Sequence, residues 1–417
     1  MPQSYEAQAE LRLLSAAKYK IISAQSSKPN YAIVQDSLLG AYKMTQGIKK
    51  IKKHHFFDIS LVTEKTTDEI LKKIQHIRRI LKEKGKKVQS FNGKGLFSLI
   101  LPNDLIYEKK NDADPNEPIV KIYRGVLYEG TLDKSTLGSS HNSLIQIMNK
   151  RYGPDEACKF IDNVQFITNK WLLHEGFSVG LEDCMVTVED KVEEIENVIQ
   201  KCFIEAEGIK TTTKNPNIRE VRIIGTLSKA KDIGLRIAKD ALDPKNNFLK
   251  TVKSGSKGDF FNIAQITGLL GQQNIQGQRV ASVMNNGKRT LPHYPFGEMP
   301  PEMEYESRGF IASSFIKGLN PREFYFHAMS GREGISDTAM GTATSGYMQR
   351  RIIKLTEDIK IQYDGTVRDI TGTIYQVAYG NNGIDPTCTV KVKGEQEVCD
   401  VSRMIEKLNM EHEQNKK

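Results

Sequence analysis

The chain has 417 residues, of which 38% are hydrophobic and 27% are charged, and its formal net charge is +9. This length predicts two or three domains with a buried core, and the hydrophobic fraction excludes a disordered chain. No apolar run exceeds about six residues, near Leu96–Leu101, so the sequence predicts no transmembrane segment.

The first quarter of the chain combines short helical patterns with a concentration of positive charge. A short helix is predicted over Glu6–Lys18, followed by a polar turn at residues 26–30 between two apolar segments. Apolar residues then recur at helical spacing over Thr67–Lys87, which predicts an amphipathic helix. Residues 43–94 hold fifteen Lys or Arg and five Asp or Glu. This basic stretch is either a phosphate-binding stripe or the solvated side of the helix.

A β-rich region is predicted next. Residues 91–102 and 119–140 have the composition of strands bounded by Gly, Asn and Pro. The polar loop between them contains Asp112 and Asp114. Two aspartates at this spacing can bind Mg²⁺ on a rigid strand end, but in a loop rich in Pro and Asn they more often form a solvated turn. We therefore predict no metal site in this loop.

Helical patterns return in the middle of the chain. One covers residues 142–169, and the clearest begins at Thr187, which has the spacing of a capping box with Asp190. A second amphipathic stretch covers Ile218–Leu242. Two long helices joined by the polar turn 211–217 predict an antiparallel helical hairpin.

A loop rich in Gly and Ser follows the hairpin. Residues 254–280 place Lys257 in this loop and then crowd an apolar segment with side-chain amides. Buried amides need hydrogen-bond partners. They therefore either cross-link neighbouring loops or line a polar channel, and the residues alone leave both alternatives open.

One long helix is predicted over residues 321–357, with Pro321 in its first turn. Four glycines lie inside it, and each costs a helix interior about 1 kcal/mol relative to Ala. The middle, 338–346, consists almost entirely of small residues. We interpret this pattern as a long helix that crosses a cleft, with a large group packed against its slim waist, the small residues 338–346. The alternative is a buried helix packed closely on another element.

The C-terminal region is predicted to contain hairpins and a charged helix. Residues 359–379 alternate in polarity, with turns at Asp364–Gly365 and at Gly372, and a helix is predicted over 401–417. Five cysteines occur without a CxxC pair, which predicts a reducing intracellular compartment without disulfides or structural zinc. The chain has no P-loop, no HExxH and no GxSxG motif, so these motifs assign no catalytic site to an α+β protein.

Three stretches of sequence carry a resemblance to a known family. The first comprises MPQSYEAQAEL and SAQSSKPNYAIVQDSLLGAY, and the second comprises LHEGFSVGLED, the helical hairpin and SGSKGDFFNIAQITGLLGQQNIQGQRV. The third runs from NNGKRTLPHYPFGEMPPE to GTATSGYMQRR. In this order they resemble the largest subunit of multisubunit DNA-directed RNA polymerases, more closely the eukaryotic and large-DNA-virus enzymes than the bacterial one. The resemblance implies a central fragment with a mixed, β-rich pore region, a helical-hairpin funnel, and a long bridge helix followed by β-hairpins.

The resemblance also implies roles for residues of the long helix. In the family this bridge helix lies beside the active centre. Thr342 and Ala343 match the positions that the template base and the end of the RNA–DNA hybrid approach. Tyr347, Arg350 and Arg351 match neighbouring positions that face nucleic acid or adjoining loops.

A second set of residues matches the pore through which nucleotides enter the family's active centre. Lys257 matches a basic position at the mouth of that pore, and Lys134 resembles another pore lysine. A lysine ammonium is a suitable point charge for a triphosphate in transit. Gln265, Gln272 and Gln273 are then expected to line or brace the pore. For each of these residues the alternative is a structural hydrogen bond.

The family's catalytic metal site is expected elsewhere. Its two Mg²⁺ ions are held by three aspartates of an Asn-Ala-Asp-Phe-Asp-Gly-Asp loop, which lies upstream of the position matching Met1. The mobile trigger loop is expected downstream. The resemblance therefore implies no catalytic residue and no metal ligand in this chain, with Mg²⁺ bound in the assembled enzyme. We expect the polypeptide to be inactive alone.

The predicted organisation follows from the same resemblance. Residues 1–168 are expected to form the active-site-flanking and pore region, 169–280 the funnel hairpin and pore loop, and 281–417 the cleft region with the bridge helix. The expected partners are the N-terminal part of the largest subunit, the second-largest subunit, DNA template, RNA product and nucleoside triphosphates, without a membrane. The nucleus, a cytoplasmic viral factory and the virion are the candidate locations.

Two other hypotheses stay open. One is a non-catalytic, polymerase-derived module that binds a polymerase, or binds nucleic acid through residues 43–94. The other is a frameshifted or intron-split gene with a longer product. The presence of Lys257, Thr342, Ala343 and the two arginines favours a polymerase component, because a docking module would not need residues of the pore and bridge helix.

Overall fold

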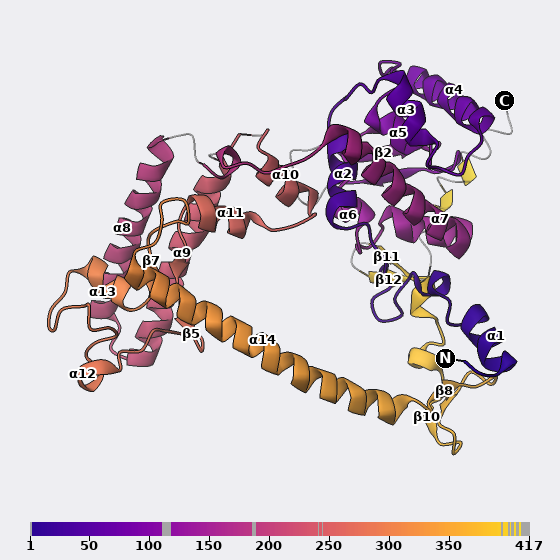
Figure 1. Cartoon of the computed structure of the whole chain (residues 1–417). Helices are drawn as coiled ribbons and strands as arrows, with labels where there is room; N and C mark the ends of the chain where they lie inside the picture. Colours follow the sequence, from indigo (N-terminus) through magenta and orange to yellow (C-terminus); the bar gives the residue numbers. More distant parts are fainter. Residues whose placement is uncertain are drawn as a thin grey trace. The chain divides into compact units, whose positions relative to one another are not determined.

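The computed structural model describes residues 2–110, 118–185, 189–240, 242–243, 245–392 and 395–398, with a few single positions up to residue 409 (Figure 1). The described chain forms two compact units. Unit 1 comprises Met1–Phe177, Lys253–Lys257 and Ile359–Lys417, and unit 2 comprises Ser178–Val252 and Gly258–Asp358. Helices with small antiparallel sheets confirm the predicted α+β class. The three-part division at residues 168 and 280 stays a prediction.

Unit 1 is built around a mostly helical core. Buried side chains from several helices form one cluster, which includes Met44, Phe56, Phe97, Phe160 and the single tryptophan, Trp171. The helices are α1 (Tyr5–Leu13), α2 (Gln35–Thr45), α3 (Lys53–Ser60), α4 (Thr67–Glu83), α5 (Gly93–Ser98), α6 (Lys134–Leu137) and α7 (Leu144–Glu175), with the 3₁₀ turn η1 (Ala17–Lys20).

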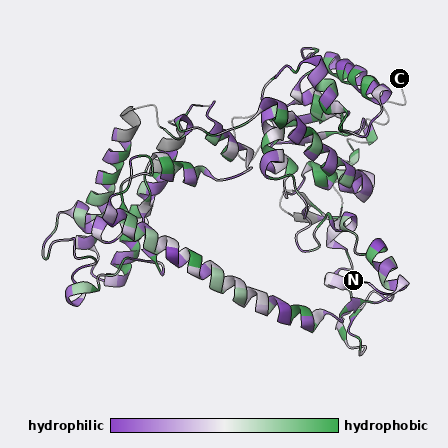
Figure 2. Ribbon diagram, in the orientation of Figure 1, coloured by the Kyte–Doolittle hydropathy of each residue, from purple (hydrophilic) through white to green (hydrophobic). Residues whose placement is uncertain are grey.

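Helix α4 confirms the amphipathic prediction. Thr66 and Glu69 form a capping box at its N-terminus, and its isoleucines enter the core. Green and purple residues alternate along it in Figure 2. One expectation was wrong: the lysines were expected on the exposed side, but Lys73 is buried with 7% of its surface exposed. Its Nζ donates hydrogen bonds to Leu101 O at 2.7 Å and Asn103 Oδ1 at 2.6 Å, which compensates for the burial of the amine.

The strand predicted over residues 91–102 was also wrong, because this segment contains α5. Asn92 caps the helix, and its Oδ1 accepts a hydrogen bond from Gly95 N at 2.7 Å. A Cβ on Gly93 would lie 1.8 Å from Met44 O, so the turn packs on α2 closer than any side chain allows. Gly93, which resembled the boundary of a strand, therefore allows α5 to pack closely against α2.

Strands β1 (Tyr107–Lys109), β2 (Val120–Tyr123) and β3 (Val126–Glu129) form an antiparallel sheet in the order β1-β2-β3. The strands predicted over residues 119–140 are confirmed for β2 and β3, but residues 134–137 form the helix α6, and β1 lies before the predicted range. The turn between β2 and β3 uses Arg124 and Gly125, both with positive φ, as a two-residue hairpin turn requires. Asp112 and Asp114 lie outside the described residues.

Helix α7 extends the predicted helix to Glu175 and bends once. Gly153 has φ 86° and ψ 174°, and Pro154 follows it, so two helical segments meet there. The C-terminal part of unit 1 packs beside the start of α7, because Lys150 Nζ donates to Cys388 O at 2.6 Å and to Thr389 O at 2.8 Å.

Unit 2 confirms the predicted helical hairpin. Helix α8 (Glu189–Thr212) pairs with α9 (Pro216–Asp240), and Ile199, Cys202, Phe203 and Leu227 are buried in a shared cluster. The ring of Phe203 stacks on Tyr305 with centroids 4.9 Å apart. Thr187, predicted to open the first helix, lies outside the described residues.

Short elements surround the hairpin. They are η2 (Glu182–Cys184), α10 (Asn247–Ser254), α11 (Phe260–Thr267), β4 (Gly271–Gln272), β5 (Asn274–Ile275), β6 (Gln278–Arg279), α12 (Met284–Gly287), α13 (Pro301–Ser307) and β7 (Phe310–Ile311). Strand β4 pairs with β7, and β5 pairs with β6, both antiparallel.

The predicted long helix is confirmed as α14 (Pro321–Thr356), drawn in orange in Figure 1. Asn320 and Glu323 form a capping box at its N-terminus, with Pro321 in the first turn. The predicted hairpins follow in unit 1, where β8 (Lys360–Ile361), β9 (Val367–Arg368) and β10 (Ile374–Gln376) form a sheet in the order β10-β9-β8. The chain continues through η3 (Tyr379–Asn381), η4 (Pro386–Cys388), β11 (Val390–Val392) and β12 (Glu395–Glu397). Most of the charged helix predicted over 401–417 lies outside the described residues.

Candidate nucleic-acid interface

Helix α14 is unusual in how little of it is covered. Glu323 and Phe326 are its buried residues, and every position from 334 to 356 is exposed. A Cβ built on Gly331, Gly334, Gly341 or Gly346 would meet nothing within 4 Å in the described chain. Packing within the described residues therefore does not explain the small residues of the waist.

The five residues predicted to contact template or hybrid lie together on this exposed helix. At about 100° per residue, they all fall within one half of the helix circumference. The guanidinium of Arg351 lies 5.6 Å from the ring centroid of Tyr347, one turn earlier. Thr342 Oγ1 donates to Thr338 O within the helix, which holds its side chain close to the backbone. Both arginines are exposed, together with Thr342, Ala343 and Tyr347.

The first turns of α14 are fixed by contacts with the short strands of unit 2. The ring of Phe326 stacks near Tyr294, with centroids 6.4 Å apart. Glu333 Oε1 accepts a hydrogen bond from Gln276 N at 2.8 Å. The helix therefore extends from a fixed N-terminal base, which positions its waist.

The predicted pore amides mainly brace this base. Gln272 Nε2 donates to Gln273 O at 2.8 Å and Arg308 O at 2.9 Å, and both glutamines are buried. Gln273 Nε2 donates to Gly271 O at 3.3 Å, and its Oε1 lies 3.3 Å from His327 Nδ1 on α14. Of the two alternatives for these amides, the described contacts correspond to cross-linking. Gln265, on α11, is half-buried and its backbone oxygen accepts from Phe315 N at 3.2 Å.

The two predicted pore lysines belong to neighbouring segments of unit 1. Lys134 is the first residue of α6 and Lys257 ends the loop 253–257, and both are exposed. A Cβ on Gly255 would lie 2.6 Å from Cβ of Lys134, so the loop backbone packs directly on the stem of that lysine. Gly255 also has φ 73°, which favours glycine there. The fold therefore brings the loop before Lys257 against the stem of Lys134, although the two segments are far apart in the sequence.

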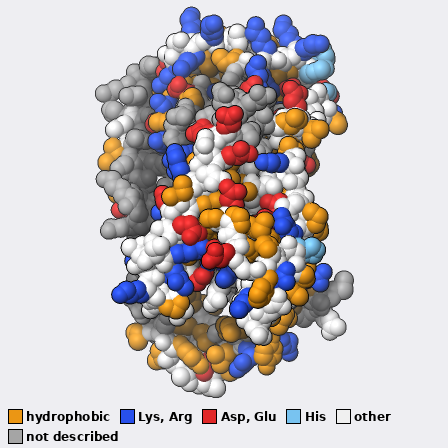
Figure 3. Space-filling model, turned by 90° about the vertical axis from the view of Figure 1, so that its left-hand side faces the viewer, with side chains coloured by type: hydrophobic (Ala, Val, Ile, Leu, Met, Phe, Trp, Pro, Cys, Tyr) orange, Lys and Arg blue, Asp and Glu red, His pale blue; other side chains and the backbone are white. Residues whose placement is uncertain are grey.

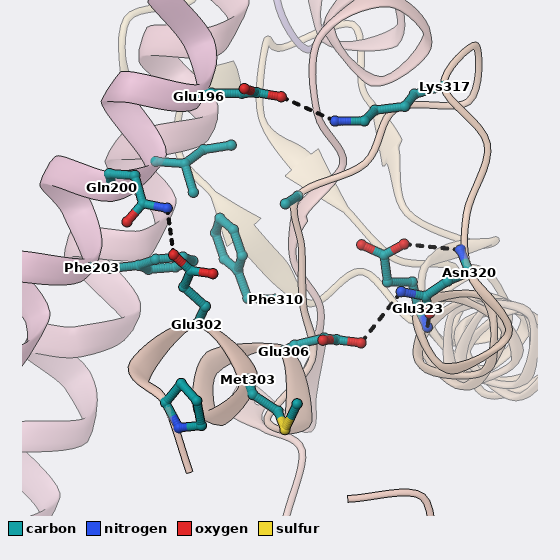
Figure 4. A pocket seen from close by; sticks show the side chains of 13 residues that line it. Glu196, Gln200, Phe203, Glu302, Met303, Glu306, Phe310, Lys317, Asn320 and Glu323 are labelled. Atoms are coloured by element: carbon teal, nitrogen blue, oxygen red, sulfur yellow. Dashed lines mark hydrogen bonds and ion pairs between the residues drawn. The ribbon is translucent and has the colours of Figure 1, made fainter. Parts of the chain in front are cut away.

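A pocket of about 410 Å³ lies within unit 2 between α8, α13, β7 and the start of α14 (Figure 4). Its floor is apolar, with Phe203 and Phe310, and its rim is ionic. Glu196 pairs with Lys317 at 3.1 Å, and Glu302 accepts from Gln200 Nε2 at 2.7 Å. No local motif in the sequence marks this pocket, because its residues are spread over more than a hundred positions.

Charged contacts also hold the hairpin of unit 2 to its neighbours. Arg279 forms a two-pronged contact with Glu220, at 2.9 and 2.8 Å, and the side chain of this arginine is nearly fully buried. Burial alone would raise the pKa of Glu220, but hydrogen bonding and the charge of Arg279 lower it below its usual value. Burial raises the pKa of Tyr305, whose hydroxyl donates to Glu207 Oε1 at 2.8 Å. These groups stabilise the scaffold.

Comparison with known proteins accounts for most of the chain. Residues 20–184 match the family model described as RNA polymerase Rpb1, domain 3. Residues 208–311 match domain 4 of the same protein, and residues 318–406 match domain 5. The three matches occur in order and together cover most of the sequence. The chain belongs to the family of largest subunits of DNA-directed RNA polymerases.

Individual relatives of this polymerase family come from viruses and from cells. The chain is 48% identical over 439 aligned residues to a probable DNA-directed RNA polymerase II subunit RPB1 homolog of Invertebrate iridescent virus 6, covering 99% of this chain and 42% of the relative. It is 34% identical to a putative DNA-directed RNA polymerase of Frog virus 3, covering 96% and 29%, and 32% identical to subunit Rpo1N of Thermococcus celer, covering 97% and 47%. The chain thus spans less than half the length of each relative.

The polymerase family implies bound Mg²⁺. The described part of the chain contains no group of three His, Cys, Asp or Glu side chains that could hold a metal ion. These residues do not fit a catalytic Mg²⁺ site. In the same part of the polymerase chain, no helix is both long and apolar enough to cross a membrane.

Proposed function

We propose that this chain is a component of a DNA-dependent RNA polymerase in which α14 is the bridge helix beside the active centre. Thr342 and Ala343 would then face the template base and the end of the RNA–DNA hybrid, with Tyr347 and the two arginines on neighbouring positions. The observation that carries the proposal is the exposure of every residue from 334 to 356 in a helix that contains four glycines. Such a helix is weakly stable by itself and gains stability from a partner that covers it.

The small waist and the arginines suit nucleic acid as that partner. A base can approach the helix backbone closely where side chains are small, and arginine guanidinium groups bind phosphate through paired hydrogen bonds. Arg351 is stacked near Tyr347, which orders the guanidinium before binding. The exposed part of α14 therefore combines the slim waist 338–346 with two cations, Arg350 and Arg351, about one turn beyond it.

We also propose that Lys134 and Lys257 lie at the pore through which nucleoside triphosphates enter. Both are exposed, and the packing of Gly255 on the Lys134 stem keeps the two segments adjacent. The ammonium groups of two exposed lysines on adjacent segments would attract the triphosphate by its negative charge. Gln272 and Gln273 would then brace the base of α14, while Gln265 would line or brace the pore.

Catalysis in this proposal needs further chains. The aspartate loop that holds Mg²⁺ would be contributed by the N-terminal part of a largest subunit, and the second-largest subunit would complete the active centre. DNA template, RNA product and nucleoside triphosphates would be the other partners, in an intracellular compartment such as the nucleus or a viral factory.

Site-specific photocrosslinking tests the role of α14. A photoreactive amino acid replaces Ala343 in the purified polymerase that contains this chain, and a matched variant replaces Met348, on the opposite half of the same helix. Ala343 should crosslink to the template strand or the RNA end several-fold more efficiently than Met348, because only its half of the helix is expected to face the hybrid. Equal yields at the two positions, or crosslinks to protein alone, would refute the proposed orientation.

The alternative function is a non-catalytic module that binds a polymerase or nucleic acid. In that case neither α14 variant would crosslink near an RNA 3′ end, even where a polymerase bound to this chain synthesises RNA on a primed template. The same preparation therefore distinguishes the two functions.

A further inference from the structure

Helix α4 in unit 1 presents a strongly basic face that the proposed function does not use. Its isoleucines are buried in the core, which leaves the opposite side in solvent. On that side, between Ile70 and Lys82, the exposed charged residues are Lys72, Arg78, Arg79 and Lys82, and this stretch of sequence contains no Asp or Glu. Exposed acids lie only at the two ends of the helix, where Asp68 and Glu69 precede Lys72 and Glu83 follows Lys82. The middle of this face therefore carries an excess of positive charge.

Two aromatic rings hold further cations beside this face. The ring of Phe91 has Lys53 Nζ at 5.8 Å and the Arg78 guanidinium at 5.5 Å from its centroid. Arg78 Nε also donates to Ser90 Oγ at 3.1 Å. At Tyr123, Lys84 Nζ lies 3.8 Å and the Arg124 guanidinium 5.2 Å from the ring centroid. Side chains held in this way lose less conformational entropy when they bind an anion.

Few carboxylates neutralise these groups. Within the described chain, Arg124 lies 4.0 Å from Glu83, and none of the four α4 cations forms an ion pair with Asp or Glu within 4 Å. Arg79 Nη2 contacts His76 Nδ1 at 3.1 Å, so this cation contacts an imidazole. Figure 3 shows Lys and Arg side chains gathered along the top of the face that it draws.

We propose that this basic surface, formed by Lys53, Lys72, Arg78, Arg79, Lys82, Lys84 and Arg124, binds the phosphate backbone of single-stranded nucleic acid without reading its sequence. It is a second contact with nucleic acid that uses no residue of α14. A row of cations with few acids, which lie at its ends, matches a chain of phosphates, and affinity of this kind comes from released counterions.

The chemistry of the surface favours nucleic acid over the other polyanions. A membrane-binding helix would expose an apolar side to lipid, but the apolar side of α4 is buried and Leu71 is its one exposed large hydrophobic residue. A protein interface is typically depleted of lysine at its centre and enriched in exposed aromatic residues. Here Phe91 and Tyr123 are already faced by cations.

The test compares two variants with the same loss of charge. The first carries K72Q, R78Q, R79Q and K82Q, and the control carries K201Q, K214Q, K229Q and K245Q, four exposed lysines of unit 2. Binding of each full-length chain to a single-stranded RNA of about 20 nucleotides is measured by fluorescence anisotropy between about 50 and 200 mM salt. The fluorescence of Trp171, buried in unit 1, confirms that each variant is folded.

Wild type and control should bind the RNA with a steep salt dependence, and the α4 variant should bind at least tenfold more weakly. Each phosphate contact contributes about 0.7 to the slope of log K against log salt for single strands, so four lost contacts should reduce that slope by about 3. Equal affinity and slope for the α4 variant and the control would overturn the proposal. Binding of wild type to polyglutamate or to phosphatidylserine vesicles, but not to RNA, would also overturn it. The α14 crosslinks are independent of this result, because they use other residues.

Discussion

At the scale of single residues, Lys73 is unusual because a lysine side chain is normally exposed to solvent and this one is buried. It is an amine on a surface helix of a basic protein, yet it lies in the core beside Leu101 and Asn103. Burial lowers the pKa of Lys73 to about 7, with a smaller contribution from the charge of Lys65. The helical spacing places residue 73 on the same face as Ile70 and Ile77, but its charge predicted an exposed side chain, and the register of α4 prevails.

The low pKa of Lys73 predicts a pH-dependent stability for unit 1. Between about pH 7 and pH 10 the unfolded chain binds a proton that the folded chain does not, so the free energy of unfolding should rise with pH by up to about 1.4 kcal/mol per pH unit from this group. Urea unfolding followed by Trp171 fluorescence at pH 7, 8 and 9 measures this slope. The variant K73M should lose this contribution.

The neighbouring lysine supplies the control. Lys72 is exposed, so K72M should keep the wild-type dependence on pH. If K73M and K72M show the same slope as wild type, the amine of Lys73 is protonated in the folded chain and its predicted pKa is wrong.

At the scale of elements, the helices that sequence patterns predicted are those whose signals are local. Helices α4, α8, α9 and α14 have apolar periodicity, a cap or a first-turn proline in their own sequence. Helix α5 was missed because its formation depends on a contact with α2, where Gly93 meets Met44. The candidate site divides in the same way into parts with and without a local signal. The residues of α14 were predicted from a sequence resemblance. The contact of Gly255 with Lys134 and the pocket of Figure 4 depend on tertiary packing and were not predicted.

The contact of α5 with α2 predicts that G93A is strongly destabilising. The added methyl group would overlap a backbone carbonyl, which cannot move as a flexible side chain can, so unit 1 should lose about 3 kcal/mol or more of stability. G225A is the matched change in α9, where a Cβ meets nothing within 4 Å. Thermal unfolding of unit 1, followed by Trp171 fluorescence, should shift to lower temperature for G93A and should not fall for G225A, because alanine fits at that position of α9. A wild-type transition for G93A would show that α5 does not pack on α2 in this way.

At the scale of the whole molecule, the chain contains two compact units, and α14 leads from unit 2 to the C-terminal part of unit 1. The net charge is likewise unevenly divided, because the dense basic stretch lies in unit 1 on α3 and α4. A polymerase component with these properties would contact nucleic acid in two ways, through the slim waist of α14 and through the basic surface of α4. The first contact is the central claim, since it assigns the exposed helix its partner.

Hydrogen exchange of α14 tests that claim most directly. The amides from 334 to 356 rely on bonds within one exposed helix, so they should exchange quickly in the polymerase without nucleic acid. Adding a template with a paired RNA primer should slow exchange in the segment 338–351 at least tenfold, while the α8–α9 hairpin stays unchanged. Identical exchange of segment 338–351 with and without the template and primer would contradict the proposed role of α14.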